Sequence, residues 1–152
     1  MTEDEHFMRE ALKEARVAFD NNEVPVGAVI EYKGEVYATG RNRRIEKNSA
    51  ISHAEIEAIQ VAGAKLGDWR LEGMTLYVTS EPCIMCAGAI IHSRIKRVVY
   101  GCKEPKMGAV ESIFRIFDIN ELHHKPEYVS GVSENECSGI LTEFFQKVRK
   151  SK

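Results

Sequence analysis

The sequence has few prolines, no long apolar run and no basic leader, and each shortage excludes a class of protein. Only 4 of its 152 residues are Pro and 11 are Gly, while 43% are hydrophobic and 29% are charged. This composition excludes collagenous and intrinsically disordered chains and is typical of a globular domain. The longest uncharged apolar runs, Val24 to Ile30 and Ile84 to Ile91, are far shorter than the roughly 18 residues of a membrane span. We therefore expect no membrane role.

The N-terminal residues and the absence of linker-like segments lead to two further expectations. Residues Met1 to Glu5 are acidic where a secretory signal would be basic, which indicates a cytoplasmic protein. No repeat, low-complexity segment or Pro/Gly/Ser-rich linker divides the chain, so residues 1–152 are predicted to form one domain.

Positive charge is also in short supply, since 21 Lys and Arg against 23 Asp and Glu give a net charge of −2. Such a chain does not attract nucleic acid over its whole surface, so any RNA contact must use local basic groups. Thirteen basic residues fall into four groups: Arg41, Arg43, Arg44 and Lys47; Arg94, Lys96 and Arg97; Lys103 and Lys106; and Lys147, Arg149, Lys150 and Lys152. RNA binding is therefore predicted to neutralise few phosphates and to depend only modestly on salt.

The four cysteines favour metal binding or catalysis over disulfides, because the compartment is expected to be reducing. Two of them lie as Cys83-Ile84-Met85-Cys86, whereas Cys102 and Cys137 stand alone. A chain of this length buries roughly 68–70% of its unfolded surface and needs no metal merely to fold. A bound metal would therefore serve function.

The pattern of apolar residues, caps and turn residues predicts alternating helices and strands. In chain order the predicted elements are a helix capped by Thr2 and ended by Asn21, strands at 26–31 and 35–40, a polar loop at 41–51, a helix from a Ser52 cap to about Lys65, a strand at 75–80, a helix from Cys83 to about Ser93, a strand at 97–101, a short helix at 112–117, a strand at 127–130, and a helix capped by Ser133 and Glu136. This order predicts an α/β fold, a three-layer α/β/α arrangement with a mixed, about five-stranded sheet.

Two of the predicted helices begin with residues that can bind a metal. His53-Ala54-Glu55 opens one, and Pro82-Cys83-Ile84-Met85-Cys86 opens the next. Two thiolates one turn apart at a helix start, with a histidine, make a three-ligand zinc site that leaves a fourth position for water, as in catalytic zinc sites. Glu55 would then lie beside that water and carry its proton.

Each part of this pattern has another interpretation when taken alone. Glu55 is the third residue after Ser52, so the pair is also an acceptable capping box. The two cysteines alone could form a redox pair or a structural zinc site, and His53 alone is more often a capping or core residue. Together, however, H-x-E followed by P-C-x-x-C is the known signature of zinc deaminases of nucleobases.

The chemistry of deamination explains why these residue types are needed. Attack on C4 of cytosine or C6 of adenine requires hydroxide at neutral pH, and bound zinc lowers the pKa of water to about 7. Glu55 would accept that proton, deliver it to the ring nitrogen, and protonate the departing amine.

Beyond the signature, nearly the whole chain resembles the bacterial tRNA-specific adenosine deaminases of the cytidine-deaminase-like superfamily. The segments that carry the resemblance are 22–29 (NEVPVGAV), Asn42, 53–56 (HAEI), 75–90 (TLYVTSEPCIMCAGAI), 92–95 (HSRI), 97–101 (RVVYG), Cys137 and 144–145 (FF). The resemblance implies a zinc-dependent homodimer, with one Zn²⁺ per chain. It further implies hydrolysis of the wobble adenosine of a tRNA anticodon to inosine, usually in an arginine tRNA.

The resemblance also implies roles for individual residues. His53, Cys83 and Cys86 match the zinc ligands and Glu55 matches the proton shuttle. The residues that match substrate-binding positions are Asn42, which contacts the flipped base, Val26 and Ala54, which line the pocket, and Glu104.

Two positions depart from the family pattern. Many relatives have aspartate where this chain has Glu104, and the glutamate keeps the charge but adds a methylene to the side chain that would contact the ribose. His123 and His124 stand where relatives often have Asn-His; His124 carries over, and His123 is interpreted as a surface residue.

Two other functions stay open at this point. One is a guanine or cytosine deaminase that acts on a free base or nucleoside. The other is a non-catalytic, zinc-stabilised RNA-binding module, for which Cys102 is the obvious fourth ligand.

Overall fold

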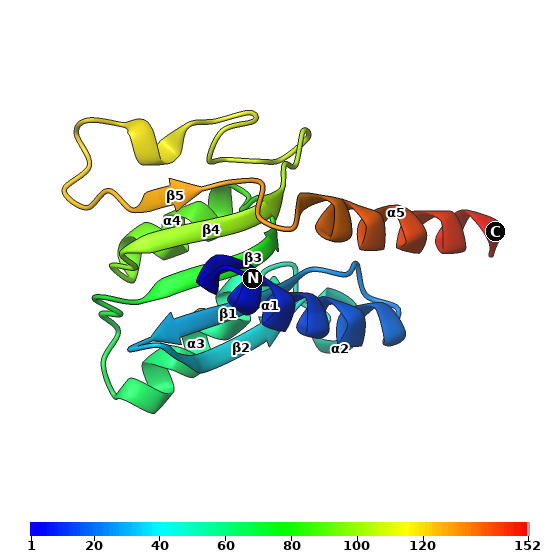
Figure 1. The fold of residues 1–152 in the computed structure, drawn as a ribbon, viewed down its shortest axis with the longest axis horizontal. Coiled ribbons are helices and arrows are strands. Elements are labelled where there is room, and N and C mark those ends of the chain that lie inside the picture. The colour runs from blue at the N-terminus through cyan, green and yellow to red at the C-terminus, as the bar shows by residue number, and fades with distance from the viewer. Residues whose placement is uncertain (152) are drawn as a thin grey trace.

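The fold is a five-stranded sheet in a computed structural model that describes residues 1–151 (Figure 1). The strand order is β2-β1-β3-β4-β5. The strands are β1 (Gly27–Tyr32), β2 (Glu35–Arg41), β3 (Thr75–Ser80), β4 (Arg97–Cys102) and β5 (Glu127–Val129). The first three pair antiparallel, and β3, β4 and β5 are parallel. The prediction of a mixed sheet of about five strands is therefore confirmed.

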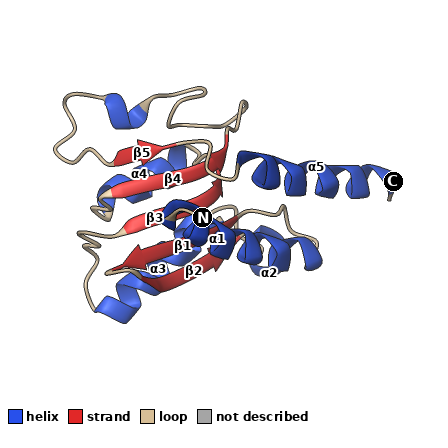
Figure 2. Ribbon diagram, in the orientation of Figure 1, coloured by secondary structure: helices blue, strands red, loops and turns tan. Residues whose placement is uncertain are grey.

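Helices cover both faces of the sheet (Figure 2). The helices are α1 (Glu3–Asp20), α2 (Arg44–Lys47), α3 (Ala54–Leu66), α4 (Ile84–His92) and α5 (Glu134–Lys150). Helices α3 and α4 pack on one face, and α1 and α5 pack on the other. The predicted three-layer arrangement is confirmed, and all six residues of β3 are buried between the layers.

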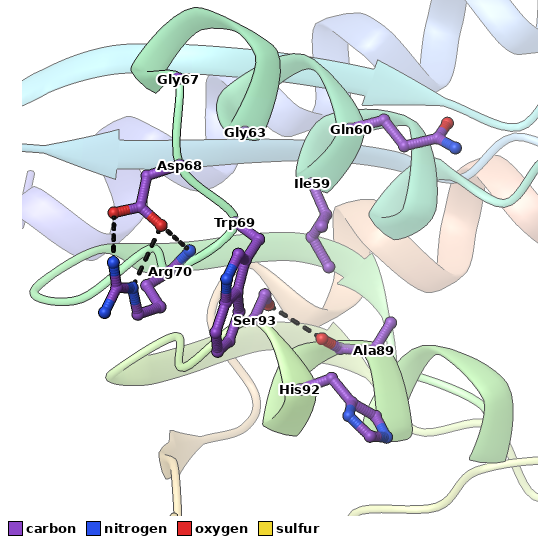
Figure 3. A pocket seen from close by; sticks show the side chains of 10 residues that line it. All are labelled: Ile59, Gln60, Gly63, Gly67, Asp68, Trp69, Arg70, Ala89, His92 and Ser93. Carbon is purple, nitrogen blue, oxygen red and sulfur yellow. Dashed lines mark hydrogen bonds and ion pairs between the residues drawn. The ribbon is translucent and has the colours of Figure 1, made fainter.

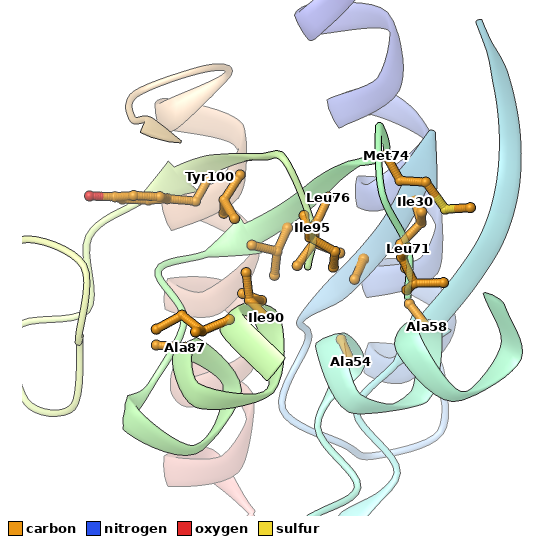
Figure 4. Close-up of a cluster of buried hydrophobic side chains, with 14 of the residues drawn as sticks. Ile30, Ala54, Ala58, Leu71, Met74, Leu76, Ala87, Ile90, Ile95 and Tyr100 are labelled. Atoms are coloured by element: carbon orange, nitrogen blue, oxygen red, sulfur yellow. The ribbon is translucent and has the colours of Figure 1, made fainter. Parts of the chain in front are cut away.

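The main hydrophobic core lies between the sheet and helices α3 and α4 (Figure 4). Small residues such as Ala54 and Ala58 let α3 approach the sheet closely. At Gly40 a Cβ atom would lie 2.2 Å from the carbonyl oxygen of Ala54, so only glycine permits this contact between β2 and the first turn of α3. This close packing fixes the start of α3 beside the end of β2.

Two predicted capping boxes do not form. His53, not Ser52, is the N-cap of α3, because the Ser52 carbonyl instead accepts a hydrogen bond from the backbone N–H of Arg43. Ser133 is the N-cap of α5, but its backbone is in the left-handed region (φ 53°) and its side chain makes no cap hydrogen bond. The capping box predicted at Thr2 and Glu5 does form.

The irregular segments differ most from the prediction. The polar loop contains the one-turn helix α2, and the helix predicted at 112–117 is replaced by a short 3-10 turn, η1 (Ile116–Asp118). The hairpin of β1 and β2 contains a β-bulge, since Ile30 pairs with Ala38 and Glu31 with Val36. No helix within residues 1–151 is long and apolar enough to cross a membrane.

Candidate metal centre and pocket

The first residues of α3 and α4 meet at one end of the sheet. His53 is the N-cap of α3 and Cys83 is the N-cap of α4, and neither side chain makes a cap hydrogen bond. The two side chains point instead at each other, with His53 Nδ1 3.6 Å from the sulfur of Cys83. Cys86, in the first turn of α4, lies equally close, 3.6 Å from the same nitrogen.

The spacing of these three donor atoms fits a zinc ion. The donor atoms of His53, Cys83 and Cys86 all lie within 4.8 Å of one another. Tetrahedral zinc, with bonds of about 2.3 Å to sulfur and 2.0–2.1 Å to nitrogen, requires its nitrogen and sulfur ligands to be about 3.6 Å apart. The observed distances of 3.6 Å meet this requirement, and the soft N/S donor set is the one that zinc prefers.

Cys102 does not belong to this cluster. Within residues 1–151, His53, Cys83 and Cys86 form the one group of three or more such side chains close enough to hold a metal ion. The Cys102 thiol donates instead to the backbone carbonyl of Thr79, at 3.5 Å, and packs in the core beside Cys137. A closed four-ligand site through Cys102 is therefore not formed.

The electrostatics of the cluster favour an anionic sulfur. Hydrogen bonds from Cys86 and His53 lower the pKa of the Cys83 thiol to about 4. The contact with Cys83, together with burial, raises the pKa of Cys86, and the same sulfur raises the pKa of His53. The cluster thus favours a thiolate, which is the form in which cysteine binds metal.

Glu55 lies beside the cluster in the first turn of α3. Its side chain is 4% exposed and contacts the Cys86 thiol. Burial raises the pKa of the carboxyl to about 7. Because Ser52 is not the N-cap, the capping-box interpretation of Glu55 is wrong.

A cavity of about 520 Å³ opens onto the cluster and Glu55. The four residues predicted to bind substrate all line it: Val26, Asn42, Ala54 and Glu104. Two apolar residues that were not expected there also line it, Ile84 and Met107, which are 49% and 57% exposed. Apolar side chains at a rim follow no periodicity, so no sequence signal was available for them.

Asn42 is held in place by backbone contacts. Its Nδ2 donates to the carbonyl of Val24 (3.2 Å), and its Oδ1 accepts from the backbone N–H of Arg44 (3.1 Å). An amide has two N–H groups and two oxygen lone pairs, so one of each is left for a ligand in the cavity.

The basic residues at 41–47 differ in whether they form ion pairs. Arg41, Arg43 and Lys47 form ion pairs with Glu46 or Glu57. Arg44, by contrast, is exposed, forms no ion pair within residues 1–151, and lines the cavity together with Lys106.

The remaining basic groups and histidines are placed as follows. Arg97 lies at the end of β4 opposite the cavity and pairs with Asp4 at 2.8 Å. Helix α5, with its basic last turn, extends beyond the sheet on the side where β3 and β4 end (Figure 1). His124 lies 2.7 Å from the carbonyl oxygen of Ile95, and His123 is exposed.

A second, wider cavity of about 810 Å³ lies at the other ends of α3 and α4 (Figure 3). It contains none of the predicted site residues. Trp69 in its wall is 60% exposed, with the guanidinium groups of Arg70 and Arg94 each 5.5 Å from its ring. Asp68 and Arg70 in its lining pair with each other at 3.1 Å, and it contains no group of side chains within residues 1–151 that could hold a metal ion, so the smaller cavity is the better candidate site.

Known proteins that are similar to this chain in sequence are deaminases. The MafB19-like deaminase family matches residues 2–149 of the chain. The tRNA-specific adenosine deaminase of Bacillus subtilis is 47% identical over 152 residues, which cover 100% of this chain and 94% of that protein. The tRNA-specific adenosine deaminase of Agrobacterium fabrum is 49% identical over 149 residues, 98% of each chain.

Solved structures of other deaminases have a similar fold. One from a study of A-to-I editing by tRNA:A34 deaminases has a TM-score of 0.86 and 50% identity, covering 89% of this chain and 98% of that chain. A guanine deaminase from Nitrosomonas europaea has a TM-score of 0.76 at 23% identity, covering 92% and 83% of the two chains. The second likeness shows a common fold and no more.

Proposed function

Since the chain belongs to the MafB19-like deaminase family and, within it, to the tRNA-specific adenosine deaminases, we propose that it hydrolyses adenosine 34 of a tRNA anticodon to inosine. The observation that supports this most directly is the meeting of a His/Cys/Cys cluster and a buried carboxylate at a cavity lined by Asn42. The reaction replaces the bond from C6 to the amino nitrogen with a bond to a water oxygen and releases ammonia.

His53, Cys83 and Cys86 would hold one zinc ion per chain, since their spacing fits its bond lengths. When bound, zinc supplies the acidity that makes water a nucleophile at neutral pH. The three ligands come from the starts of two helices, so the packing of α3 against α4 sets the distances between them.

Glu55 is the proposed proton carrier. It lies two residues from His53 at the cavity and is shielded from bulk water, so a proton on its carboxylate is kept for the reaction. It accepts a proton from the attacking water and transfers it to the ring nitrogen of adenine. It then accepts the remaining proton of the hydroxyl added at C6 and transfers it to the amine, so that ammonia leaves and the C6 carbonyl forms.

The other cavity residues would hold the flipped nucleotide. The free N–H and lone pair of Asn42 match the donors and acceptors of a purine edge, and Val26 and Ala54 close the wall around the ring. Glu104 lies in the same cavity, and we propose that it meets the ribose.

The partner is proposed to be an anticodon stem-loop, for which an arginine tRNA is the first choice. Loop bases are unstacked and can enter a cavity without opening a duplex. Arg44 and Lys106 at the cavity offer cations to the backbone, and the exposed Ile84 and Met107 offer apolar surface to neighbouring bases. Such a substrate also implies a cytoplasmic location.

A homodimer is part of the proposal. Val61 and Leu66 on α3 are 48% and 38% exposed, which leaves apolar side chains uncovered on the layer that contains the site. Sedimentation of the purified protein would measure its mass.

The decisive experiment uses the purified protein after its zinc content has been measured. It is incubated with an arginine-tRNA anticodon stem-loop that has A34, and the digested nucleosides are analysed by mass spectrometry. We expect inosine in place of one adenosine. Release of ammonia from free guanine or cytidine, with no inosine in the stem-loop, would favour the free-base deaminase instead.

Replacing Glu55 with Gln tests the proton carrier. We expect the variant to keep its zinc and its melting temperature but to lose at least about 100-fold in turnover, the usual contribution of a general acid–base group. Undiminished turnover would show that the carboxylate takes no part.

Replacing Cys102 with Ser tests the structural-zinc alternative. Because the Cys102 thiol contacts Thr79 in the core, we expect one equivalent of zinc to remain. Loss of that equivalent, measured by elemental analysis, would indicate a closed site without room for water.

A further inference from the structure

A second buried glutamate lies next to the site, outside the set of residues considered so far. Glu81 follows β3 directly and precedes the Pro82-Cys83 turn into α4. Its side chain is 3% exposed, and it forms no ion pair within residues 1–151. A carboxylate buried without a cation needs hydrogen-bond donors to replace its lost hydration.

Those donors all come from one segment, residues 104–112. Oε2 of Glu81 accepts the backbone N–H groups of Val110 (3.1 Å), Glu111 (2.8 Å) and Ser112 (3.0 Å). Oε1 accepts the backbone N–H of Glu104 (3.0 Å) and the hydroxyl of Ser112. One side chain thus fixes both ends of the segment.

The five donors fill the acceptor capacity of the carboxylate, which has about four lone-pair sites. Glu81 therefore has no acceptor left for a substrate, although it borders the cavity. Any effect on the reaction has to pass through the segment that it holds.

That segment forms one wall of the cavity, since Glu104, Lys106 and Met107 line it. Two backbone contacts also join it to the metal turn: the N–H of Ala109 donates to the Pro82 carbonyl (2.9 Å), and Gly108 bridges to Cys83. The position of Glu104 is thereby tied to the position of the metal ligands.

We propose that Glu81 is a positioning residue that sets the contact between Glu104 and the substrate ribose. The inference rests on the proposed function. Glu81 holds the Glu104 backbone through Oε1 and the far end of the segment through Oε2, so the Glu104 carboxylate is presented at a fixed depth in the cavity.

Glu81→Gln isolates this contact. With its oxygen placed at Oε2, the amide keeps the three N–H donors of residues 110–112, while its NH₂ group faces the Ser112 hydroxyl and the Glu104 N–H. The hydroxyl can rotate and accept, but the Glu104 N–H cannot, so the substitution breaks the anchor of Glu104 specifically.

The experiment compares two stem-loops that differ only in having ribose or 2′-deoxyribose at A34. We expect Glu81→Gln to raise KM for the ribose substrate about tenfold, with kcat within threefold, and to reduce the preference for ribose. The same loss is expected in Glu104→Ala, and the double variant is expected to lose no more than either single variant. Zinc content should stay at one equivalent.

The matched control is Glu23→Gln. Glu23 is 2% exposed and accepts the backbone N–H groups of Ile45 and Glu46, so it anchors the opposite loop in the same way. The control is expected to leave the ribose preference unchanged. Additive losses in the Glu81/Glu104 double variant, or an equal loss of preference in the control, would overturn the inference.

Backbone amide exchange gives a test that does not depend on activity. In zinc-loaded Glu81→Gln, the Glu104 amide should exchange at least tenfold faster, while the amides of residues 110–112 change less. Ser112→Ala, which removes one donor and keeps the Glu81 charge, should show a smaller effect in the same direction. Unchanged exchange at Glu104 would overturn the anchor itself, whereas an inactive wild type would overturn only the proposed function.

Discussion

Gly108 shows how little room single residues have at the cavity wall. A Cβ atom at this position would lie 2.4 Å from Cδ of Glu81 and 2.5 Å from the carbonyl oxygen of Glu104. The backbone must therefore move if any side chain is added here.

We expect Gly108→Ala to raise KM for the stem-loop about tenfold or more, because the displaced segment contains Glu104. Zinc content should not change. Steady-state kinetics and elemental analysis check both statements.

Gly139→Ala is the matched control, since nothing lies within 4 Å of a Cβ atom at that position in α5. It should leave KM unchanged and stabilise the helix by about 0.5–1 kcal/mol. A KM for Gly108→Ala that equals the wild-type value would show that the segment tolerates displacement.

At the residue scale, the sequence predicted which metal-binding side chains meet better than it predicted the backbone around them. The spacing of His53, Cys83 and Cys86 was enough to predict that they would meet, because both motifs begin helices beyond strand ends. The sequence could not predict that Glu81 accepts hydrogen bonds from residues 104–112, because those N–H groups belong to irregular backbone with no periodic pattern. The roles of the predicted site residues stay predictions until the variants are measured.

At the scale of elements, α1 is joined to the sheet by a polar contact. Arg97 donates two hydrogen bonds to the Asp4 carboxylate (2.9 and 2.8 Å), and the Tyr77 hydroxyl donates another (2.8 Å). The Arg97 hydrogen bonds lower the pKa of Asp4 below its ordinary value, although burial opposes them. The contact thus stabilises the folded state while Asp4 is ionised.

Stability should therefore depend on pH through Asp4. Its pKa is lower in the folded chain than the unfolded value of about 3.9, so the stabilisation is complete above about pH 5 and is lost as the pH falls through the folded value. We expect Asp4→Asn to lower the free energy of unfolding by about 1–2 kcal/mol at pH 7, and the difference from wild type to shrink towards pH 2. Urea denaturation at several pH values measures this.

Asp68→Asn serves as the control for this prediction. Asp68 pairs with Arg70 two residues away on an exposed loop, and such pairs rarely add measurable stability. A pH-independent difference for Asp4→Asn would show that packing, not charge, holds α1.

Regular elements were predictable because they have periodic patterns. The strand at 75–80 and the last helix were found within a few residues of their observed bounds. The one-turn helix α2 was missed because a single turn shows no periodicity, and its N-terminal N–H groups bond to Glu23, which is distant in sequence. The predicted single domain stays a prediction.

For the whole molecule, the distribution of charge predicts how RNA binding responds to salt. Three of the four cations at 41–47 are paired with Glu46 or Glu57. Arg44 and Lys106 at the cavity, and the exposed Lys103 next to Glu104 in sequence, form no ion pair within residues 1–151. Three phosphates on a single-stranded loop give a slope of log K against log salt of about −2.

Fluorescence anisotropy of a labelled stem-loop between 50 and 300 mM salt, on the order of the range in which such slopes are measured, checks this value. Arg44→Gln should reduce the slope by about 0.7, the contribution of one phosphate contact. Arg97→Gln, at the far end of β4 and already paired with Asp4, should leave the slope unchanged. A slope steeper than about −5 would mean that the paired cations also reach the RNA.

The bulge in the β1–β2 hairpin bears on how copies of this chain avoid aggregation. Edge strands present unpaired backbone groups on which another strand can assemble, and bulges and lysines oppose this. Edge strand β2 contains the extra residue Tyr37, whose carbonyl accepts a hydrogen bond from Lys65 (3.2 Å), and whose ring lies 4.3 Å from the Lys65 ammonium. The opposite edge, β5, is only three residues long. Fibril-like growth through the sheet is thus obstructed at both edges.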